Sequence, residues 1–513
     1  MSSHKGNRLD IRSARRLLAV AASAGLARIA AGQEALPPEP ELPPDVPAGQ
    51  EAPSLPDGSA GGDELLQFAD IPVVVSGSRT EQPITQSSLP ISIITKDDIR
   101  YSGILRIEHL LSNATGVDML RLDRNRSAIG VRGLHHEFAD RTLFLVDGRD
   151  GSDPFFGGVD FQRLPIFAAD IERIEVVRGP GGAAWGANAF NGVVNVLTKS
   201  PKDTTGFLAA TQVNEFGDVF THLRYGAETG KTAWRLSAGY EDQESSEDAL
   251  SPDSFSSDDF YRRWIGDFEA ETQLSKEARL EFGIGYTNFT RGSEEFLGVQ
   301  PESEYNFHST RPHVKFVHEE DADTSWYVRW FGNFDDSYRP NFWSYLATEN
   351  DLEAQYNFKP VDSHRVSVGA NARLVTIDTE GGPPDVLSGA NSYSEQWLGA
   401  FVIDRWDMTA RFTLESQARV DWYSETQTDF SGRVTALYGL DRSKKHVVRA
   451  AVAKAFRAPS AAIRNTEALH LPVGGGLYGI NVLRPEGLSN EEVYYGELGY
   501  TAVLSKGITL NAT

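Results

Sequence analysis

The long C-terminal part of the chain alternates between apolar and polar residues with a period of two. From about residue 205 onward, neighbouring side chains differ in polarity over runs of roughly ten residues or more. A period of two indicates β-strands that have one apolar and one polar face. The runs that show it best are Thr232–Tyr240, Ala278–Thr287, His364–Leu374, Arg411–Tyr423 and Glu492–Leu504. We therefore predict a large antiparallel sheet.

The two faces of these strands suggest where the sheet lies. In Thr232–Tyr240, Trp234 and Leu236 share one face, whereas Arg235 and Ser237 share the other. A dense polar face suits a water-filled lumen, and an apolar face with aromatic ends suits lipid. A soluble β-sandwich also alternates, but its strands are usually about 5–6 residues long. The pattern favours a transmembrane antiparallel β-barrel.

Residues 90–199 have a different, mixed pattern. Ile91–Ile94 predicts a strand, and Thr95 is placed to cap the N-terminus of a helix with acidic residues in its first turn. Apolar residues then recur at helical spacing. Leu143–Val146 and Ile174–Val177 are short apolar runs typical of buried strands. We predict a mixed α/β domain ahead of the barrel.

The N-terminal residues predict export rather than a folded domain. Residues 1–32 have a basic start that ends at Arg16, an apolar stretch over Leu17–Ala31 and small residues for cleavage, as in a signal peptide. The alternative is a disordered basic tail. Residues 33–66 are rich in Pro and Glu and contain few large apolar side chains, so we expect a flexible linker.

The most specific pattern lies between Val131 and Thr198. Four short motifs follow one another there: Val131–Gly133, Asp140–Gly148, Ile171–Gly181 and Trp185–Val196. Together and in this order they resemble the plug domain of TonB-dependent outer-membrane receptors. We expect their turn-forming residues to punctuate the fold. These residues are Gly133, Asp147, Gly148, Gly179, Pro180, Gly181, Gly186 and Gly192.

The resemblance extends into the C-terminal part through Lys454–Ser460, Leu483–Glu486 and Glu497–Tyr500. It implies a TonB box and plug domain over residues 67–202, inside a partial β-barrel over 203–513. The expected location is the outer membrane of a Gram-negative cell, with outer-membrane lipid around the barrel.

The family resemblance implies an energised importer and no enzyme activity. An external ligand would bind at loop tips and the plug apex. TonB, with the ExbB–ExbD inner-membrane complex, would then pull on the plug, and the ligand would pass unchanged. A small metal chelate, by default a ferric siderophore, is the expected ligand. Haem, cobalamin and a non-functional truncated receptor are alternatives, and no cofactor is expected.

Five residues ahead of the plug resemble the TonB box, and we call them the coupling segment. They are Ile71, Pro72, Val73, Val74 and Val75. Strand addition draws its affinity from backbone hydrogen bonds, so an extended run matters more than particular side chains. The alternative is that the same residues form the first strand of the plug.

Glu175, Arg178 and Glu497 match positions that lock the plug to the barrel in similar receptors. Strand alternation alone places Glu497 on the lumen side. Its neighbour Leu498 belongs to the apolar, lipid-facing set, and adjacent residues of a strand point to opposite faces. A desolvated ion pair would make a suitable latch, since loss of one partner strands a buried charge. The alternative is a solvent-screened pair worth under about 1 kcal/mol.

Three histidines are candidate ligand contacts. His135 and His136 lie in the plug, and His470 lies between two barrel motifs, where haem receptors place a ligand histidine. The alternative is that they are ordinary loop residues. No cluster has the spacing of a metal site.

Composition excludes several other classes. No run supplies the roughly 20 apolar residues of a membrane helix. The chain has no cysteine, which excludes disulfides, thiol nucleophiles and thiolate metal sites. A net charge of −23 without a basic face argues against nucleic acid as a partner. The acidity serves either solubility or acidic loops at a cation-rich cell surface.

Two other functional classes fit less well. A passive porin or adhesin barrel would lack the coupling segment and the plug motifs. A periplasmic hydrolase would need a nucleophile and a base in a recognisable arrangement, and none is visible.

The barrel is expected to be incomplete. Residues 205–513 hold roughly 12 to 16 strands of about 10 residues, whereas outer-membrane transporters of this kind have about 22. The sequence stops within Ile508–Thr513, apparently in mid-strand. An open edge in lipid costs several kcal/mol per unsatisfied backbone group. We therefore expect a piece of a longer gene, and the alternative is a naturally shorter barrel.

Overall fold

A computed structural model describes residues 71–121, 124–133, 140–245, 259–293, 303–339, 343–379, 392–465, 487–505 and 508–513. The predicted signal peptide and linker therefore lie outside the described residues. So do the Gly- and Pro-rich interval Gly381–Gly389, which we expect to form an extracellular loop, and most of the acidic interval Asp242–Asp259, for which we expect the same.

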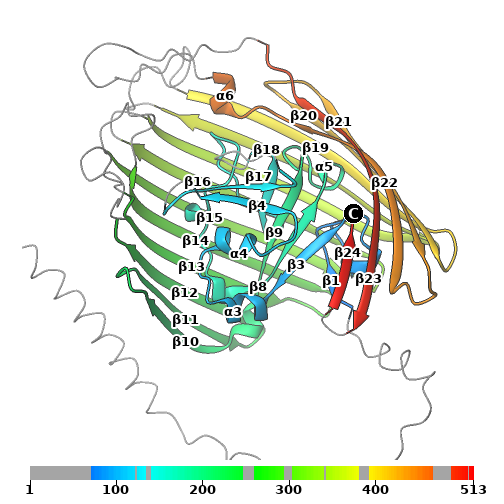
Figure 1. Ribbon diagram of the computed structural model, residues 1–513, viewed down its shortest axis with the longest axis horizontal. Coiled ribbons are helices and arrows are strands. Elements are labelled where there is room, and N and C mark those ends of the chain that lie inside the picture. The colour runs from blue at the N-terminus through cyan, green and yellow to red at the C-terminus, as the bar shows by residue number, and fades with distance from the viewer. Residues whose placement is uncertain are drawn as a thin grey trace, which may run out of the picture.

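A 15-stranded antiparallel sheet, here called the wall, curves around the N-terminal domain (Figure 1). Each strand pairs with the next one in the chain. The strands are β10 (Gly206–Val213), β11 (Val219–Thr229), β12 (Thr232–Gln243), β13 (Tyr261–Gln273), β14 (Ala278–Ser293), β15 (Ser303–Glu319), β16 (Ser325–Arg339), β17 (Trp343–Val361), β18 (His364–Asp378), β19 (Ser392–Asp407), β20 (Phe412–Tyr423), β21 (Asp429–Gly439), β22 (His446–Arg457), β23 (Glu491–Ser505) and β24 (Ile508–Ala512). This number lies within the predicted range.

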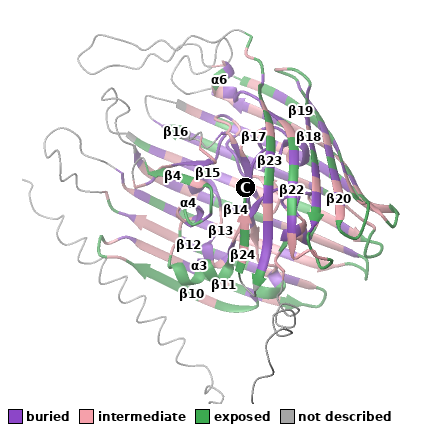
Figure 2. Ribbon diagram, turned by 45° about the vertical axis from the view of Figure 1, so that its right-hand side comes forward, coloured by how far each residue is buried: buried purple, intermediate pink, exposed green. Residues whose placement is uncertain are grey.

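Burial along these strands is inverted relative to a soluble protein. In β12, Arg235 and Ser237 are buried against the plug, whereas Leu236 is 52% exposed on the outside. The alternation of buried and exposed residues is visible along the strands in Figure 2. Because side chains on a strand point to opposite faces in turn, one polar and one apolar face follow directly from the sequence pattern. The predicted barrel orientation is confirmed.

The two ends of the wall differ in their connections. At one end, β11 finishes at Thr229 and β12 starts at Thr232, and the other connections are similarly short. At the opposite end, β22 finishes at Arg457 and β23 starts only at Glu491. Outer-membrane barrels have short periplasmic turns and longer extracellular loops. We therefore assign the short-turn end to the periplasm and the long-loop end to the outside.

The wall has two edge strands, β10 and β24. Within the part of the chain that the structure describes, no pairing between them closes the sheet. The expected incomplete barrel is therefore what the structure shows.

The plug combines short sheets with short helices inside the wall (Figure 1). Its central sheet has five strands in the order β3-β8-β9-β6-β7, and only β6 and β9 pair in parallel. The central strands are β3 (Ile91–Thr95), β6 (Thr142–Val146), β7 (Arg149–Asp150), β8 (Ile171–Arg178) and β9 (Gly192–Thr198). Two small ribbons pair β1 (Val73–Val74) with β2 (Gln82–Pro83) and β4 (Val117–Arg121) with β5 (Ser127–Val131). The predicted mixed α/β architecture is confirmed.

Helices lie around the plug sheet and at the end of the wall. They are α3 (Lys96–Ser102), α4 (Ile107–Leu111), α5 (Gly182–Trp185) and α6 (Ala461–Asn465), with 3-10 turns η1 (Ile84–Gln86), η2 (Phe161–Arg163), η3 (Ala168–Asp170) and η4 (Pro201–Thr204). Helix α3 begins at the predicted cap, since the Thr95 side chain accepts from the Asp98 backbone N–H and Asp98 bonds back. None of the described helices is both long and apolar enough to cross a membrane.

Both faces of the plug sheet are covered. Ile174 and Val176 of β8 pack with Leu110 of α4 in one apolar cluster. Val177, the next residue, points the other way into a second cluster that includes Val74. Residues 174–177 of β8 are therefore all buried, including the charged Glu175 between Ile174 and Val176.

Candidate functional site

The interface between the plug and the inner face of the wall is the candidate site. Charged side chains of the wall form buried ion pairs with charged side chains of the plug. These pairs are Arg79–Glu353 at 2.5 Å, Asp150–Arg373 at 2.7 Å, Asp170–Arg224 at 2.6 Å, Arg132–Glu497 at 3.2 Å, and Asp140–Arg457. A buried charge is tolerated only when it is paired and hydrogen-bonded, so each pair fixes the plug relative to the wall.

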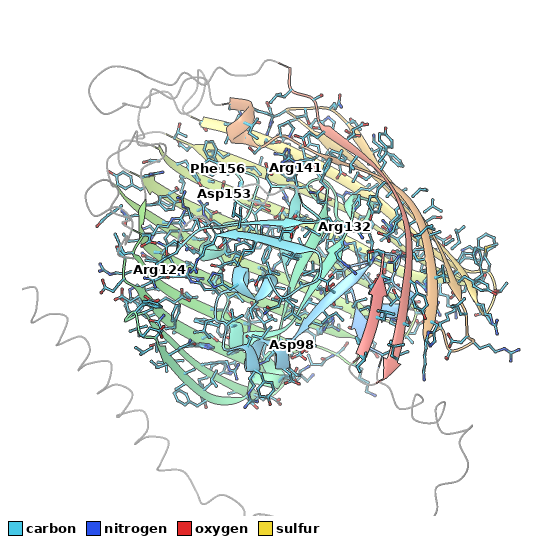
Figure 3. The ribbon with its side chains drawn as sticks, viewed as in Figure 1. Asp98, Arg124, Arg132, Arg141, Asp153 and Phe156 are labelled. Atoms are coloured by element: carbon cyan, nitrogen blue, oxygen red, sulfur yellow. The ribbon has the colours of Figure 1, made fainter. Side chains whose placement is uncertain are left out.

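Glu497 lies on the inner face of β23, on the side that alternation predicted. One carboxylate oxygen lies 3.2 Å from Nη2 of Arg132 and accepts a hydrogen bond from the Tyr495 hydroxyl at 2.7 Å. The other accepts a hydrogen bond from Nε of Arg449 at 3.0 Å. Glu497 thus joins the plug, through Arg132 (labelled in Figure 3), to the wall cation Arg449.

We expected an ion pair between Arg178 and Glu497, and this prediction is wrong. Among the described residues, Arg178 forms no ion pair, and its Nε has no hydrogen-bond partner. Burial lowers the pKa of Arg178, and the nearby charges of Arg132 and Arg449 lower it further. Arg132, which has a left-handed backbone with a φ of 58°, pairs with the Glu497 carboxylate instead.

Glu175 is also placed differently from the prediction. It is fully buried and makes its hydrogen bonds within the plug. Its carboxylate accepts hydrogen bonds from the backbone N–H of Val75 at 3.0 Å and of Ser76 at 2.9 Å, and from Nε of Arg173 at 2.8 Å. The expectation that Glu175 bridges plug and wall is therefore wrong. It fastens the chain beside the coupling segment.

The coupling segment itself is folded into the plug. Val73 and Val74 form β1 and pair with Pro83 and Gln82, respectively. Val74 is fully buried, and Ile71 packs against the same apolar cluster. This arrangement corresponds to the alternative of a first plug strand, and the coupling role of the segment remains a prediction.

Arg79 anchors the chain just beyond the coupling segment, and sequence reasoning missed it. Its guanidinium lies 4.5 Å from the ring centroids of both Trp185 and Phe401. Glu353 pairs with Arg79 and, at 2.9 Å, with Arg329. Burial alone would lower the pKa of Arg79, but the Glu353 carboxylate raises it. The only signal in the sequence is a lone cation after an apolar run.

Asp170 makes a second anchor near the short-turn end. It accepts hydrogen bonds from Nη1 of Arg224 at 2.6 Å and from the Ser237 hydroxyl at 2.7 Å. Burial alone would raise the pKa of Asp170, but the adjacent His222 side chain and the charge of Arg235 hold it well below its usual value. The carboxylate therefore stays ionised at neutral pH.

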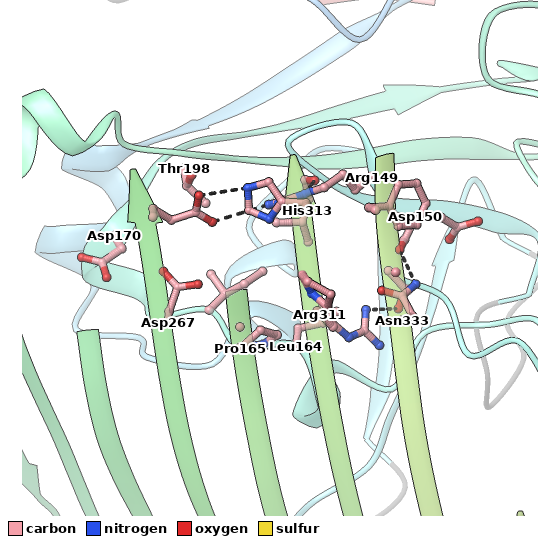
Figure 4. Close-up of a pocket in the computed structure, with 18 of the residues that line it drawn as sticks. Arg149, Asp150, Leu164, Pro165, Asp170, Thr198, Asp267, Arg311, His313 and Asn333 are labelled. Carbon is pink, nitrogen blue, oxygen red and sulfur yellow. Dashed lines mark hydrogen bonds and ion pairs between the residues drawn. The ribbon is translucent and has the colours of Figure 1, made fainter. Parts of the chain in front are cut away.

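A cavity of about 590 Å³ lies between β7 and the wall, beside their contacts. Figure 4 shows Arg149 and Asp150 on the plug side and His313 and Asn333 on the wall side. Glu269 lies 3.1 Å from Nε2 of His313 and 3.8 Å from Arg149. Among the described residues, no group of three or more His, Asp or Glu side chains could hold a metal ion.

A second cavity, also about 590 Å³, lies towards the long-loop end, near Asp153 and Phe156 (Figure 3). Arg163 crosses it and donates to the Tyr305 hydroxyl at 2.7 Å. Arg291 lies 3.3 Å from Asp160. Burial would raise the pKa of Asp160, but the charges of Arg291 and Arg163 lower it. We call this cavity the apex pocket.

The predicted turn residues act in two ways. Asp147 and Gly148, with φ of 49° and 75°, form the tight connection between β6 and β7. Two successive left-handed residues make the type of turn that matches strand twist. Gly192 instead permits close packing, because a Cβ there would lie 2.6 Å from the Val177 carbonyl oxygen.

The candidate ligands His135, His136 and His470 lie outside the described residues.

Two family models match the chain. One, described as the TonB-dependent Receptor Plug Domain, matches residues 83–193. The other, described as the TonB dependent receptor-like beta-barrel, matches residues 176–513.

Curated relatives are longer than this chain. The "Iron-regulated outer membrane virulence protein" of Vibrio cholerae serotype O1 is 24% identical over 447 residues, which are 83% of this chain and 65% of the relative. The "Vitamin B12 transporter BtuB" of Vibrio vulnificus is 28% identical over 250 residues, which are 46% of this chain and 39% of the relative. The chain thus spans just under two thirds of the first relative and less of the second.

Solved structures share the fold. The siderophore receptor PirA from Pseudomonas aeruginosa superposes with a TM-score of 0.63 at 20% identity, over 80% of this chain and 71% of that one. The ferripyoverdine receptor from the same organism gives 0.64 at 15% identity, over 84% and 63%.

Proposed function

The chain belongs to the TonB-dependent receptors of the outer membrane, and we propose that it imports a ferric siderophore with energy supplied through TonB. One observation carries the proposal. The plug occupies the inside of the wall and is held there by buried ion pairs, so a ligand can pass only after the plug has rearranged.

The need for energy follows from these contacts. Removing one partner of a buried pair costs about 3–5 kcal/mol, and Arg79–Glu353 and Asp150–Arg373 are only two of several such pairs. A passive porin would instead offer an open, water-filled lumen. The inner-membrane proton gradient, delivered by TonB with ExbB–ExbD, is a suitable source of the work.

The coupling segment is the proposed contact with TonB. It lies at the N-terminal edge of the plug and contains the short strand β1, which pairs only with the equally short β2. A pair of this length is easily exchanged for another strand. Strand addition is how extended peptides commonly bind a partner.

An iron chelate is the favoured ligand. The Vibrio cholerae relative is named for its iron regulation, and the two solved receptors are named for a siderophore and for ferripyoverdine. In the apex pocket, the guanidinium group of Arg291 lies 4.8 Å from the ring centroid of Tyr305. Guanidinium and aromatic groups suit an anionic, aromatic chelate. The similarity to a vitamin B12 transporter makes cobalamin the second candidate.

Uptake assays would test the proposal. The full chain is expressed in a Gram-negative host without iron-chelate receptors, with and without functional TonB. Radioactive iron is supplied as a ferric tris-catecholate or a ferric trihydroxamate, and labelled cobalamin is supplied separately. We expect iron uptake only with TonB. Uptake without TonB would indicate a passive barrel, cobalamin uptake would reassign the ligand, and no uptake of any probe would indicate a receptor without transport activity.

A further inference from the structure

We propose that Glu175 is a clasp that keeps the coupling segment folded in the plug, and that its release frees this segment for an incoming strand. The inference rests on the proposed function, because it assigns a residue to the control of TonB access. It replaces the plug-to-wall role that the sequence suggested for Glu175.

The contacts of Glu175 are strong and local. The side chain is fully buried on β8, and its Oε2 accepts from the backbone N–H of Val75 and Ser76 at 3.0 and 2.9 Å. Hydrogen bonds to an ionised group are roughly twice as strong as neutral ones. Two such bonds fix the last residue of the coupling segment and the residue that follows it.

Ser76 is held from its other sides as well. Nε1 of Trp185 donates to the Ser76 carbonyl oxygen at 2.8 Å. Nδ2 of Asn195 lies 3.1 Å from the Ser76 hydroxyl. A carboxylate from β8, an indole from α5 and an amide from β9 therefore converge on one residue.

The clasp and an incoming strand need the same backbone groups. Strand addition pairs the N–H and C=O groups of an extended segment with those of a partner. Val73 and Val74 already pair with β2, and the N–H groups of Val75 and Ser76 are taken by Glu175. Val73 to Ser76 can therefore be docked or bound by a partner strand, but not both. A partner that binds only the released state shifts the population towards it.

Release leaves Glu175 with a partner. Arg173 stays 2.8 Å from its Oε1, and both residues lie on the same strand, so the carboxylate remains paired after the segment has left. An unpaired buried carboxylate would make release very costly. The arrangement is therefore suited to repeated opening and closing.

A spin label can report release directly. The chain has no cysteine, so Val73→Cys creates a single labelling site, and Val73 is 44% exposed, which leaves room for a nitroxide. Label mobility is measured with the full chain in outer-membrane vesicles, without ligand or TonB. In a Glu175→Gln background, we expect the mobile fraction to rise roughly tenfold, because two hydrogen bonds to a charged group are weakened.

Glu172→Gln is the matched control. Glu172 lies on the same strand and pairs with Lys96 at 2.8 Å, away from the coupling segment. This variant should leave label mobility unchanged. Glu175→Asp keeps the charge but withdraws the carboxylate, so it should also release the segment. If the Glu175→Gln variant does not fold, label mobility in Glu175→Asp tests the proposal instead.

Unchanged mobility in a folded Glu175→Gln or Glu175→Asp variant would overturn the proposal. Folding is checked by hydrogen exchange of β9. Binding of the purified TonB C-terminal domain to the vesicles should rise in parallel with mobility. Mobility that rises without any gain in TonB binding would retain the clasp and reject the coupling role, so the two proposals fail separately.

Discussion

Single residues determine how firmly the plug is held, and the Glu353 carboxylate shows why the partners of a pair are not equivalent. It binds Arg79 of the plug and Arg329 of the wall at once. Losing the carboxylate leaves two guanidinium groups without their shared partner, whereas losing Arg79 leaves Glu353 paired with Arg329.

Glu353→Gln should therefore weaken the plug more than Arg79→Gln. We expect a cost of about 3–5 kcal/mol for the first and about 1.5–3 kcal/mol for the second. Urea titration of the purified receptor, followed by hydrogen exchange in β1 and β2, measures both. Equal costs would contradict the shared role of Glu353.

Arg132 and Arg178 give a second comparison. Arg132→Ala removes the ion pair with Glu497, whereas Arg178→Ala removes a guanidinium that has no carboxylate partner among the described residues. We expect faster hydrogen exchange in the plug of the Arg132 variant and little change in the Arg178 variant. The opposite order would restore the arrangement that the sequence suggested.

His109 makes the plug sensitive to acid. Burial, and then the charges of Arg106 and Arg121, lower its pKa from 6.5 to about 4. The unfolded plug therefore takes up a proton below about pH 6.5, while the folded plug does not until about pH 4. Stability should fall as the pH drops through this window, and His109→Gln should lessen the fall in urea midpoints. A variant with the same pH dependence as the parent would exclude His109.

These residues also show what the sequence could predict. Alternation placed Glu497 on the inner face correctly, since a strand allows only two directions. It could not choose between Arg178 and Arg132, because that choice depends on which side chain reaches across the interface to the Glu497 carboxylate. The histidine candidates stay predictions.

At the scale of elements, the sequence predicted the structure best where a single physical rule determines the local conformation. Thr95 caps α3 as predicted, with Asp98 completing a capping box, and Ile174–Val177 of β8 is buried as predicted. The coupling segment was ambiguous, because the same β-branched residues suit a plug strand and a partner-binding strand equally well.

The turn between β6 and β7 can be tested with two glycines. Gly148 and Gly103 both have positive φ, so replacing either with Ala should cost roughly 1–2 kcal/mol. A Cβ at Gly148 would also lie 2.9 Å from Nη1 of Arg329, whereas Gly103 has open space around it. Gly148→Ala should therefore destabilise the plug more than Gly103→Ala in urea titrations. Equal losses would indicate that Arg329 moves aside freely.

At the scale of the whole molecule, passage requires the plug to move relative to the wall. A Cβ at Gly182 of α5 would lie 3.5 Å from that of Ser431 on β21. This separation is within the range for a disulfide, about 3.5–4.5 Å. The cysteine-free chain makes such a bond unique.

Gly182→Cys with Ser431→Cys should therefore block uptake when oxidised and restore it after reduction. Each single variant serves as its control. Radioactive iron uptake in cells, before and after a reducing agent, measures the effect. Undiminished uptake in the fully oxidised protein would mean that α5 stays in place during transport.

The order of the wall strands also has a consequence for folding. Every wall strand pairs with its neighbour in the chain, so the sheet can grow hairpin by hairpin from local contacts. The plug contacts are distant in sequence: 223 positions separate Asp150 from Arg373, and 317 separate Asp140 from Arg457. Distant contacts form slowly, because long loops must close first. The plug should therefore be the last part of the molecule to settle, after the wall strands have paired.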